Sequence, residues 1–417
     1  MTIAGEITRI NNNIADAYTA CSGKGATMPV TQNSDNLADC IDSISGGGGV
    51  GITREVSAQG TYQRPASSFT FSLPSAATKM GIRALYYAFY KCSSLTNLDL
   101  SSLTTISNQS AMENAFNACT SLTSVDLSSL TTVSGGSVMN SAFSGCTSLT
   151  SIDLSSLTTV SGNNDMYSAF YNTRPTSLDL SSLTTVSGNH AMESAFANCS
   201  SLTSVDLSSL TTVSGNTGSG MCKVFINCTS LTSVDLSSLT TVSGTSAMEY
   251  AFSNSKISSN PLSSLTTVSG QNVMYGVFKN CTNLPSSITF SNLEIIGADN
   301  SNIDMCQFRE AFNDTNVTSL TFTNLEKIYC TANVSAGGTF YNNTTIQKMY
   351  FPKLDTITYG TGAASNIQVA CKYIFYSCTS LTELHFGAAN QSAIEASAGY
   401  STAWGRGAGN VTIYFDL

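Results

Sequence analysis

The stretch SVDLSSLTTVSG stands at residues 124–135 and again at 204–215 and 233–244, with near copies at 151–162 and 177–188. A phenylalanine recurs in step with it, mostly every 26 to 29 residues, at Phe89, Phe116, Phe143, Phe170, Phe196, Phe225, Phe252, Phe278, Phe312, Phe340 and Phe375. A period of this length is typical of a solenoid, whose coils bury their apolar side only against one another. We therefore expect these rings to form a continuous file inside a stack of coils.

One coil can be followed from residue 122 to residue 146. Val125 and Leu127 flank Asp126 at the two-residue spacing of a short strand, which would join a parallel sheet. The second half has apolar residues at i, i+3, i+4 and i+7, which predicts one face of a short helix, namely Met139, Ala142, Phe143 and Cys146. Each coil is thus predicted to be a strand, a bend and a short helix.

Thirteen cysteines are present, and none is part of a CxxC pair. Seven of them lie three residues after a recurring phenylalanine, where other copies have Thr173, Ser255, Thr315 or Asn343. A disulfide framework could not accept these exchanges, but a slot for a small, buried, weakly polar side chain could. We expect packing rather than disulfide bonds or metal sites, and no cofactor.

The pattern resembles the leucine-rich repeat. Leu122, Val125, Leu127 and Leu130 match that family's strand segment, and the AFSGC element at 142–146 looks like the BspA-type subclass. The resemblance covers residues 85–386 and implies an α/β repeat fold, a leucine-rich-repeat solenoid with a parallel sheet and short helices. The Asn of the usual strand-to-bend corner is missing, so we do not expect that ladder.

The ends of the chain differ from the array. Residues 1–45 have a heptad-like seam, which predicts an N-terminal helical hairpin, with apolar positions at Ile3, Ile7, Ile10 and Ile14. It is either a plain hairpin or, as we favour, a docking or oligomerising module that makes a homo-oligomer possible. Residues 46–51 form a glycine-rich linker, residues 52–84 an N-terminal β cap, and residues 387–417 a C-terminal cap.

The whole arrangement also looks like tail-associated virion proteins of phages. The residues that carry this are the start ITRINNNIADAY, the glycine joint, the repeat array and the end VTIYFDL. The resemblance implies attachment to other virion or tail proteins through residues 1–45 and a distal surface that touches the host. It implies localisation in the virion after synthesis in the host cytoplasm; the alternative is the bacterial cell surface.

Composition and charge exclude several functions. A formal net charge of −9 argues against nucleic-acid binding, and no apolar run is long enough to insert into a membrane. The two histidines, His190 and His385, lie beside no recognisable nucleophile motif, and paired carboxylates occur only at the repeat spacing. We predict that the protein is not an enzyme.

One carboxylate per coil occupies the outward position of the predicted strand, at Asp99, Asp126, Asp153, Asp179, Asp206 and Asp235. Neighbours about 4.8 Å apart repel by roughly 0.9 kcal/mol in water, so some interaction should offset the repulsion. Either each Asp accepts a hydrogen bond from the Ser-Ser backbone that follows it, or the column binds a cation or a basic partner. Pro261 takes the same position and should end the column.

Beyond Pro261 the outward positions become varied. The Asp position holds Thr289, Thr321, Tyr350 and His385, and two residues earlier stand Lys348 and Glu383. Mixed aromatic and polar groups on a rigid sheet suit recognition. We predict that these residues bind a bacterial surface glycan or protein, as part of a phage tail or baseplate adhesion protein; the alternatives are a BspA-like cell-surface adhesin and a structural spacer.

Overall fold

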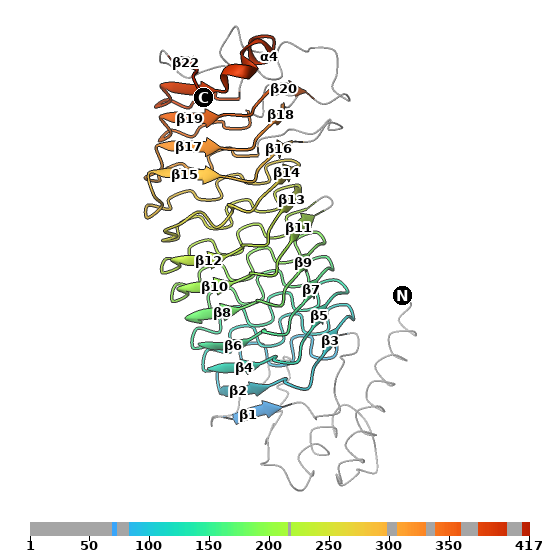
Figure 1. Cartoon of the computed structure of the whole chain (residues 1–417). Coiled ribbons are helices and arrows are strands. Elements are labelled where there is room, and N and C mark those ends of the chain that lie inside the picture. The colour runs from blue at the N-terminus through green and yellow to red at the C-terminus, as the bar shows by residue number, and fades with distance from the viewer. Residues whose placement is uncertain are drawn as a thin grey trace, which may run out of the picture.

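The computed structural model describes residues 69–72, 83–215, 218–297, 307–330, 338–359, 374–397 and 411–417. These residues form a solenoid in which each coil lies on the next along the axis of a rod (Figure 1). The predicted repeat stack is confirmed. Each regular coil has two short strands, however, where one was predicted, because residues such as Thr132 and Val133 form a second strand after the first.

The first strands of the coils form three parallel sheets, and β22 closes the last of them. Their bounds are β1 (Phe69–Ser72), β2 (Leu95–Asp99), β4 (Ser124–Asp126) and β6 (Ser151–Asp153); β8 (Ser177–Asp179), β10 (Ser204–Asp206) and β12 (Ser233–Asp235); β15 (Ser287–Phe290), β17 (Ser319–Phe322), β19 (Lys348–Phe351), β21 (Glu383–Phe386) and β22 (Thr412–Phe415).

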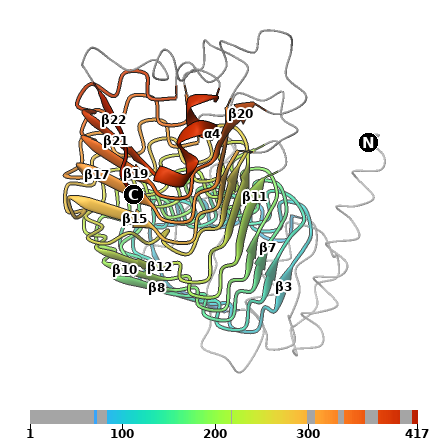
Figure 2. The ribbon, with the colours of Figure 1, turned by 45° about the horizontal axis from the view of Figure 1, so that its top comes forward.

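The second strands form one ten-stranded parallel sheet along another face of the rod (Figure 2). Their bounds are β3 (Thr105–Ile106), β5 (Thr132–Val133), β7 (Thr159–Val160), β9 (Thr185–Val186), β11 (Thr212–Gly215), β13 (Thr241–Gly244), β14 (Thr267–Ser269), β16 (Ile295–Ile296), β18 (Lys327–Cys330) and β20 (Thr356–Tyr359).

The file of phenylalanine rings runs through the interior as predicted. Phe143 is fully buried, and its ring centroid lies 5.3 Å from that of Phe116 and 5.1 Å from that of Phe170, with interplanar angles of 6°. The stacking continues from Phe89 to Phe278 and, tilted, to Phe312. Each ring therefore depends on the coil before it and the coil after it.

Near the C-terminus the file changes partners. Phe340 stacks on Phe308 at 5.8 Å, not on Phe312, and Phe375 continues from Phe340. Asn343 is buried beside this change of partners: its amide oxygen accepts a hydrogen bond from the Phe312 N–H, and its amide nitrogen donates to the carbonyls of Phe308 and Phe340. The expectation of one unbroken register is wrong here, because two phenylalanines four residues apart both fit the core.

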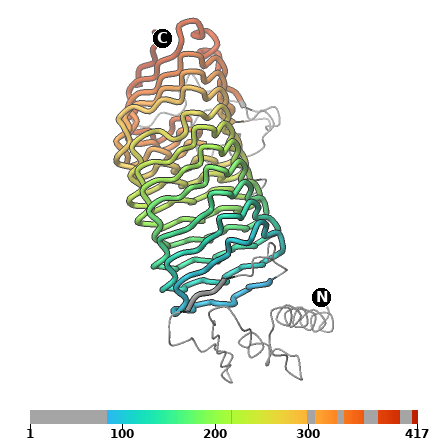
Figure 3. The backbone as a smooth tube through the Cα atoms, turned by 60° about the horizontal axis from the view of Figure 1, so that its bottom comes forward, coloured from blue at the N-terminus to red at the C-terminus, as the bar shows by residue number. Residues whose placement is uncertain are grey.

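The predicted short helix is wrong for the coils in which this segment is described. Between the second strand and the next coil the chain makes successive four-residue turns, with Ser137, Ser141 and Gly145 at φ values of 55°, 53° and 73°. Alternate amides bond back three residues, as from Ala142 to the Met139 carbonyl, and the others bond to the next coil. The turns thus join coils as a sheet does, which helical hydrogen bonding would prevent; the tube in Figure 3 shows the coils evenly stacked.

The cysteine slot is confirmed in the described part of the chain. The eight cysteines described there are buried and form no disulfide bond with one another. The Cys146 thiol donates to the Phe116 carbonyl of the preceding coil at 3.1 Å, and Thr173 in the same slot donates its hydroxyl to the Phe170 carbonyl at 2.7 Å. The slot needs a small donor, which explains why cysteine, threonine and serine exchange there.

The candidate site lies on the last sheet of first strands, which is bounded by the coil with Pro261 and by β22. The coil with Pro261 has no first strand, so β12 is the last member of its sheet and β15 starts another. At the far end β22 pairs with β21 in parallel, and the segment predicted as a C-terminal cap contains the short helices η2 (Ala388–Asn390) and α4 (Gln391–Glu395). The predicted N-terminal hairpin, with Ile3, Ile7, Ile10 and Ile14, lies outside the described residues, as do the linker at 46–51 and most of the cap at 52–84.

Candidate ligand-binding face

The six aspartates lie in two registered groups rather than one column. Asp99, Asp126 and Asp153 pair across β2, β4 and β6, and a second group of three pairs across β8, β10 and β12, consisting of Asp179, Asp206 and Asp235. The break falls between β6 and β8, which are not hydrogen-bonded to each other. The hydrogen-bonded register of the aspartates is therefore interrupted between Asp153 and Asp179, although β6 and β8 remain in contact.

Each of these carboxylates accepts a hydrogen bond from the amide of the serine two residues later, at 2.9 to 3.1 Å. For Asp99, Asp153 and Asp179 the serine hydroxyl also donates. At Asp99 and Asp179 the hydroxyl and amide bonds together lower the pKa of the carboxyl. The local bond offsets part of the repulsion between neighbouring charges, so the fold itself gives these aspartates a role. No group of three metal-binding side chains occurs among the described residues.

The distal residues come together on the face of β15 to β22. Thr289, Thr321, Tyr350 and His385 are paired in succession along the sheet, and Lys348 lies beside Glu383. Thr289 and Thr321, at the end of this row nearest to the Pro261 coil, have neither a charge nor an aromatic ring. From β19 onward the row becomes aromatic and charged, so the candidate site is concentrated on the last three strands.

An ion network links these strands. The Lys348 ammonium lies 2.9 Å from the Glu383 carboxylate, which also contacts Nε2 of His385 at 3.1 Å. Nδ1 of His385 contacts the Asp416 carboxylate at 2.9 Å. The hydrogen bonds from Lys348 and His385 lower the pKa of Glu383, and the bond to Glu383 raises the pKa of Lys348. The imidazole, 11% exposed, is thus held in its own plane between two carboxylates.

The same imidazole is stacked between two tyrosine rings. Its centroid lies 4.6 Å from that of Tyr350 and 4.5 Å from that of Tyr414, with interplanar angles of 20° and 10°. The two tyrosines thus cover the faces of the imidazole, while its two nitrogens contact Glu383 and Asp416. The face therefore presents hydroxyl groups, carboxylates and an ammonium group in fixed positions, which suits directional hydrogen bonds to a ligand.

Two members of this cluster, Tyr414 and Asp416, were missed by the sequence analysis. Residues 411–415 were assigned only to the C-terminal cap at 387–417. Since β22 pairs with β21 residue for residue, Tyr414 continues the row of Tyr350 and His385. The signal was present in the alternation of VTIYFD, which places Tyr414 on the outward side once Ile413 and Phe415 pack toward the core.

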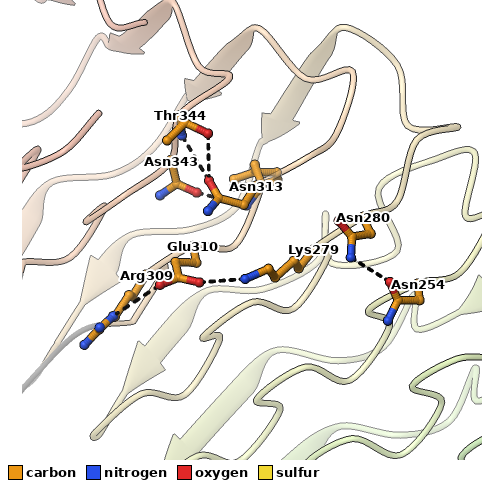
Figure 4. A network of polar contacts seen from close by, with 9 residues as sticks. Asn254, Lys279, Asn280, Arg309, Glu310, Asn313, Asn343 and Thr344 are labelled. Atoms are coloured by element: carbon orange, nitrogen blue, oxygen red, sulfur yellow. Dashed lines mark hydrogen bonds and ion pairs between the residues drawn. The ribbon is translucent and has the colours of Figure 1, made fainter. Parts of the chain in front are cut away.

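A second polar cluster lies on the turn face and was also missed (Figure 4). The Glu310 carboxylate lies 2.9 Å from the Lys279 ammonium and 3.9 Å from Nε of Arg309. The Arg309 guanidinium lies between the rings of Tyr275 and Tyr341, at 5.1 and 4.8 Å from their centroids. Glu310 is nearly buried, so the two cations stabilise a carboxylate in the coil where the phenylalanine file changes partners.

An asparagine ladder stabilises the neighbouring corner of the rod. The side-chain amides bond from coil to coil at 2.7 to 2.8 Å, through Asn198, Asn227, Asn254 and Asn280. All four have a left-handed backbone, which asparagine adopts more readily than most residues. The usual corner ladder of leucine-rich repeats was not expected, and an equivalent device is present at another corner.

Comparison with known proteins identifies the family. The sequence pattern described as "BspA type Leucine rich repeat region (6 copies)" matches residues 67–140, 112–222, 221–328 and 249–364, well over half of the chain. The chain belongs to the BspA-type leucine-rich-repeat family. No curated protein sequence matches it. The repeat fold of this family is a scaffold for binding other proteins or ligands, and no described helix is long and apolar enough to cross a membrane.

Several solved structures are similar to this BspA-type chain. A leucine-rich repeat protein from Bacteroides ovatus is 17% identical, with 85% of this chain and 94% of that chain covered and a TM-score of 0.37. A leucine rich cell surface protein from Faecalibacterium prausnitzii is 15% identical, with 87% and 92% covered and a TM-score of 0.29. These values describe a shared kind of repeat and nothing more specific.

Proposed function

We propose that this chain is a non-catalytic adhesion protein that contacts a bacterial surface through the outward face of β15 to β22. The observation that carries the proposal is the fixed cluster of Lys348, Glu383, His385 and Asp416 between the rings of Tyr350 and Tyr414. A rigid sheet that holds charged and aromatic groups in place loses little conformational freedom on binding.

The setting we propose first is a phage tail or baseplate. Its support is the resemblance of both ends of the chain to tail-associated proteins, with residues 1–45 docking onto other tail proteins. A bacterial cell-surface adhesin is the second candidate, and membership of the BspA-type family favours it. Antibodies against the chain would label purified phage particles in the first setting and intact bacteria in the second.

The contact face is tested by replacing Lys348, Tyr350, Glu383 and His385 with alanine and measuring binding of the labelled protein to intact bacterial cells. We expect binding to fall at least tenfold while the far-ultraviolet circular dichroism stays unchanged. The matched control carries four alanines at Asp126, Asp153, Asp206 and Asp235 and should bind normally. Unchanged binding by the distal variant would refute this contact face, and loss in the control alone would assign adhesion to the aspartates.

A further inference from the structure

The ten-stranded sheet presents a surface that the proposed function does not use. In seven successive coils its outward position is a threonine, and the strands pair in strict register along the row Thr105, Thr132, Thr159, Thr185, Thr212, Thr241 and Thr267. Two residues later a serine shares the outward side, for example Ser214, Ser243 and Ser269 within their strands. On the spacing of parallel strands the threonine row is roughly 30 Å long.

The fold does not use the hydroxyl groups of this row. The preceding threonine of each pair is structural: Thr131 and Thr158 donate their hydroxyls to carbonyls of the coil before at 3.0 and 2.9 Å. In contrast, the side chains of the row make no hydrogen bond to another described residue. All seven threonines are half-buried, so each side chain packs partly against its coil while its hydroxyl group reaches solvent.

The coil does not require threonine at this position either. Beyond Thr267 the same register continues through Ile295, Lys327 and Thr356, and the sheet stays paired. Threonine suits a strand, but so do isoleucine and, at this exposed position, lysine. The uninterrupted row over seven coils is therefore a property of the surface and not of the backbone beneath it.

The surface has a simple chemical character. Over the seven coils its outward strand positions carry threonine and serine and no charged or aromatic side chain. Hydroxyl groups both donate and accept hydrogen bonds. A matching ligand is uncharged, rich in hydroxyl groups, extended along the rod, and repeated at a spacing near that of the coils.

We propose that this face, the threonine row with its flanking serines, binds an extended, neutral, linear polysaccharide that lies along the rod. Each coil would contribute one or two hydrogen bonds to the sugar hydroxyls. Such bonds replace bonds to water and are individually weak, but the rigid stack adds them without further ordering of the protein. Affinity should therefore rise with the length of the sugar chain.

The experiment is affinity electrophoresis of the full chain in native gels that contain one dissolved polysaccharide. The probes are xylan and mixed-linkage β-glucan as neutral extended chains, dextran as a neutral flexible chain, and polygalacturonate as an acidic chain. We expect xylan or β-glucan to retard the protein and dextran and polygalacturonate to leave it unaffected. A six-sugar fragment of the retarding polymer should compete at least tenfold less well per sugar than the polymer.

The row is tested with Thr159→Val and Thr212→Val together, which remove two hydroxyls but keep the shape and the strand preference of the side chain. We expect at least threefold weaker retardation, and a larger loss when Thr132→Val and Thr185→Val are added. The control combines Thr323→Val and Thr356→Val, which lie outside the row, and should stay within twofold of the unchanged protein.

Three outcomes would overturn the proposal. They are no retardation by either extended neutral polymer, equal retardation by dextran or polygalacturonate, and retardation unchanged in the variant with four valines. The row variants and the distal alanine variant alter different sheets, so this proposal and the proposed contact face can fail independently of each other.

Discussion

The file of phenylalanine rings predicts that one substitution has different costs at different places. Phe143 is fully buried and stacked on both sides, whereas Phe89, which stacks on Phe116 at 5.2 Å, is only half-buried. Replacing a buried phenylalanine with alanine lowers the free energy of unfolding by about 3–5 kcal/mol. Each aromatic ring pair that is lost contributes about 0.5–1.5 kcal/mol to such a decrease. We expect Phe143→Ala to cost about 4 kcal/mol and Phe89→Ala about half of that.

The assay is urea denaturation followed by circular dichroism, with hydrogen–deuterium exchange of peptides from each coil. Because each coil contacts only its neighbours, Phe143→Ala should speed exchange most in the coils of Phe116 and Phe170 and progressively less beyond them. Phe143→Leu is the control, since it keeps most of the buried volume and loses only the ring pairs. Equal costs at Phe89 and Phe143, or uniform exchange along the rod, would refute the nearest-neighbour stack.

Three further predictions concern single side chains. Asp165→Asn should cost about 1–3 kcal/mol of unfolding free energy, because the buried carboxylate accepts hydrogen bonds from the amides of Gly136 and Gly162 and an amide nitrogen would face one of these donors. Burial raises the pKa of Asp165, so the unchanged protein should lose stability as pH rises through the folded pKa. In denaturation measured at several pH values, the variant should lack this decrease of stability with pH. Lys348→Met should move the pKa of Glu383 upward in a carbon-13 NMR titration while the thermal midpoint hardly changes, because the pair is exposed. Cys146→Ser should be tolerated, because serine fills the slot elsewhere, whereas Cys146→Leu should lower the free energy of unfolding by about 1–3 kcal/mol through overpacking, as read from urea midpoints.

The interior of the rod could be predicted from the sequence because its physical demands repeat. A ring that must stack on the next ring recurs at a fixed phase, so the period alone was enough to place Phe116, Phe143 and Phe170 in one file. The outward position of Asp126 followed equally from Val125 and Leu127 on either side. Periodicity reports burial, and burial is what a stack of coils repeats most faithfully.

The turns could not be predicted from apolar spacing alone. Over eight residues, positions 139, 142, 143 and 146 fit a helix and a run of four-residue turns equally well. The distinguishing signal is polar: Ser137, Ser141 and Gly145 stand four apart, and so do Asn164, Ser168 and Asn172 in the next coil, all with positive φ. Asparagine, serine and glycine at steps of four favour left-handed positions and argue against a continuous helix.

The distal site was only partly predictable, because its members come from three coils of unequal length. Lys348, Tyr350, Glu383 and His385 could be aligned by register. Asp416 lies after β22 and outside the repeat, so the register could not place its ion pair with His385. Periodicity therefore cannot place side chains that lie outside the repeat, however regular the rest of the chain.

The division between inward and outward residues also bears on what the protein binds. Every coil uses its apolar residues, its cysteine slot and its backbone amides to hold its neighbours, so a ligand can be recognised only by outward side chains. Two sets of these side chains differ in kind: seven coils present a uniform hydroxyl row, and the distal coils present single, unlike groups. A uniform row can recognise only a ligand that repeats, whereas the unlike groups around His385 can recognise a compact feature that occurs once. The threonine row and the distal cluster would therefore bind different parts of a ligand. A surface polymer with a distinct terminal or branching group would bind to both.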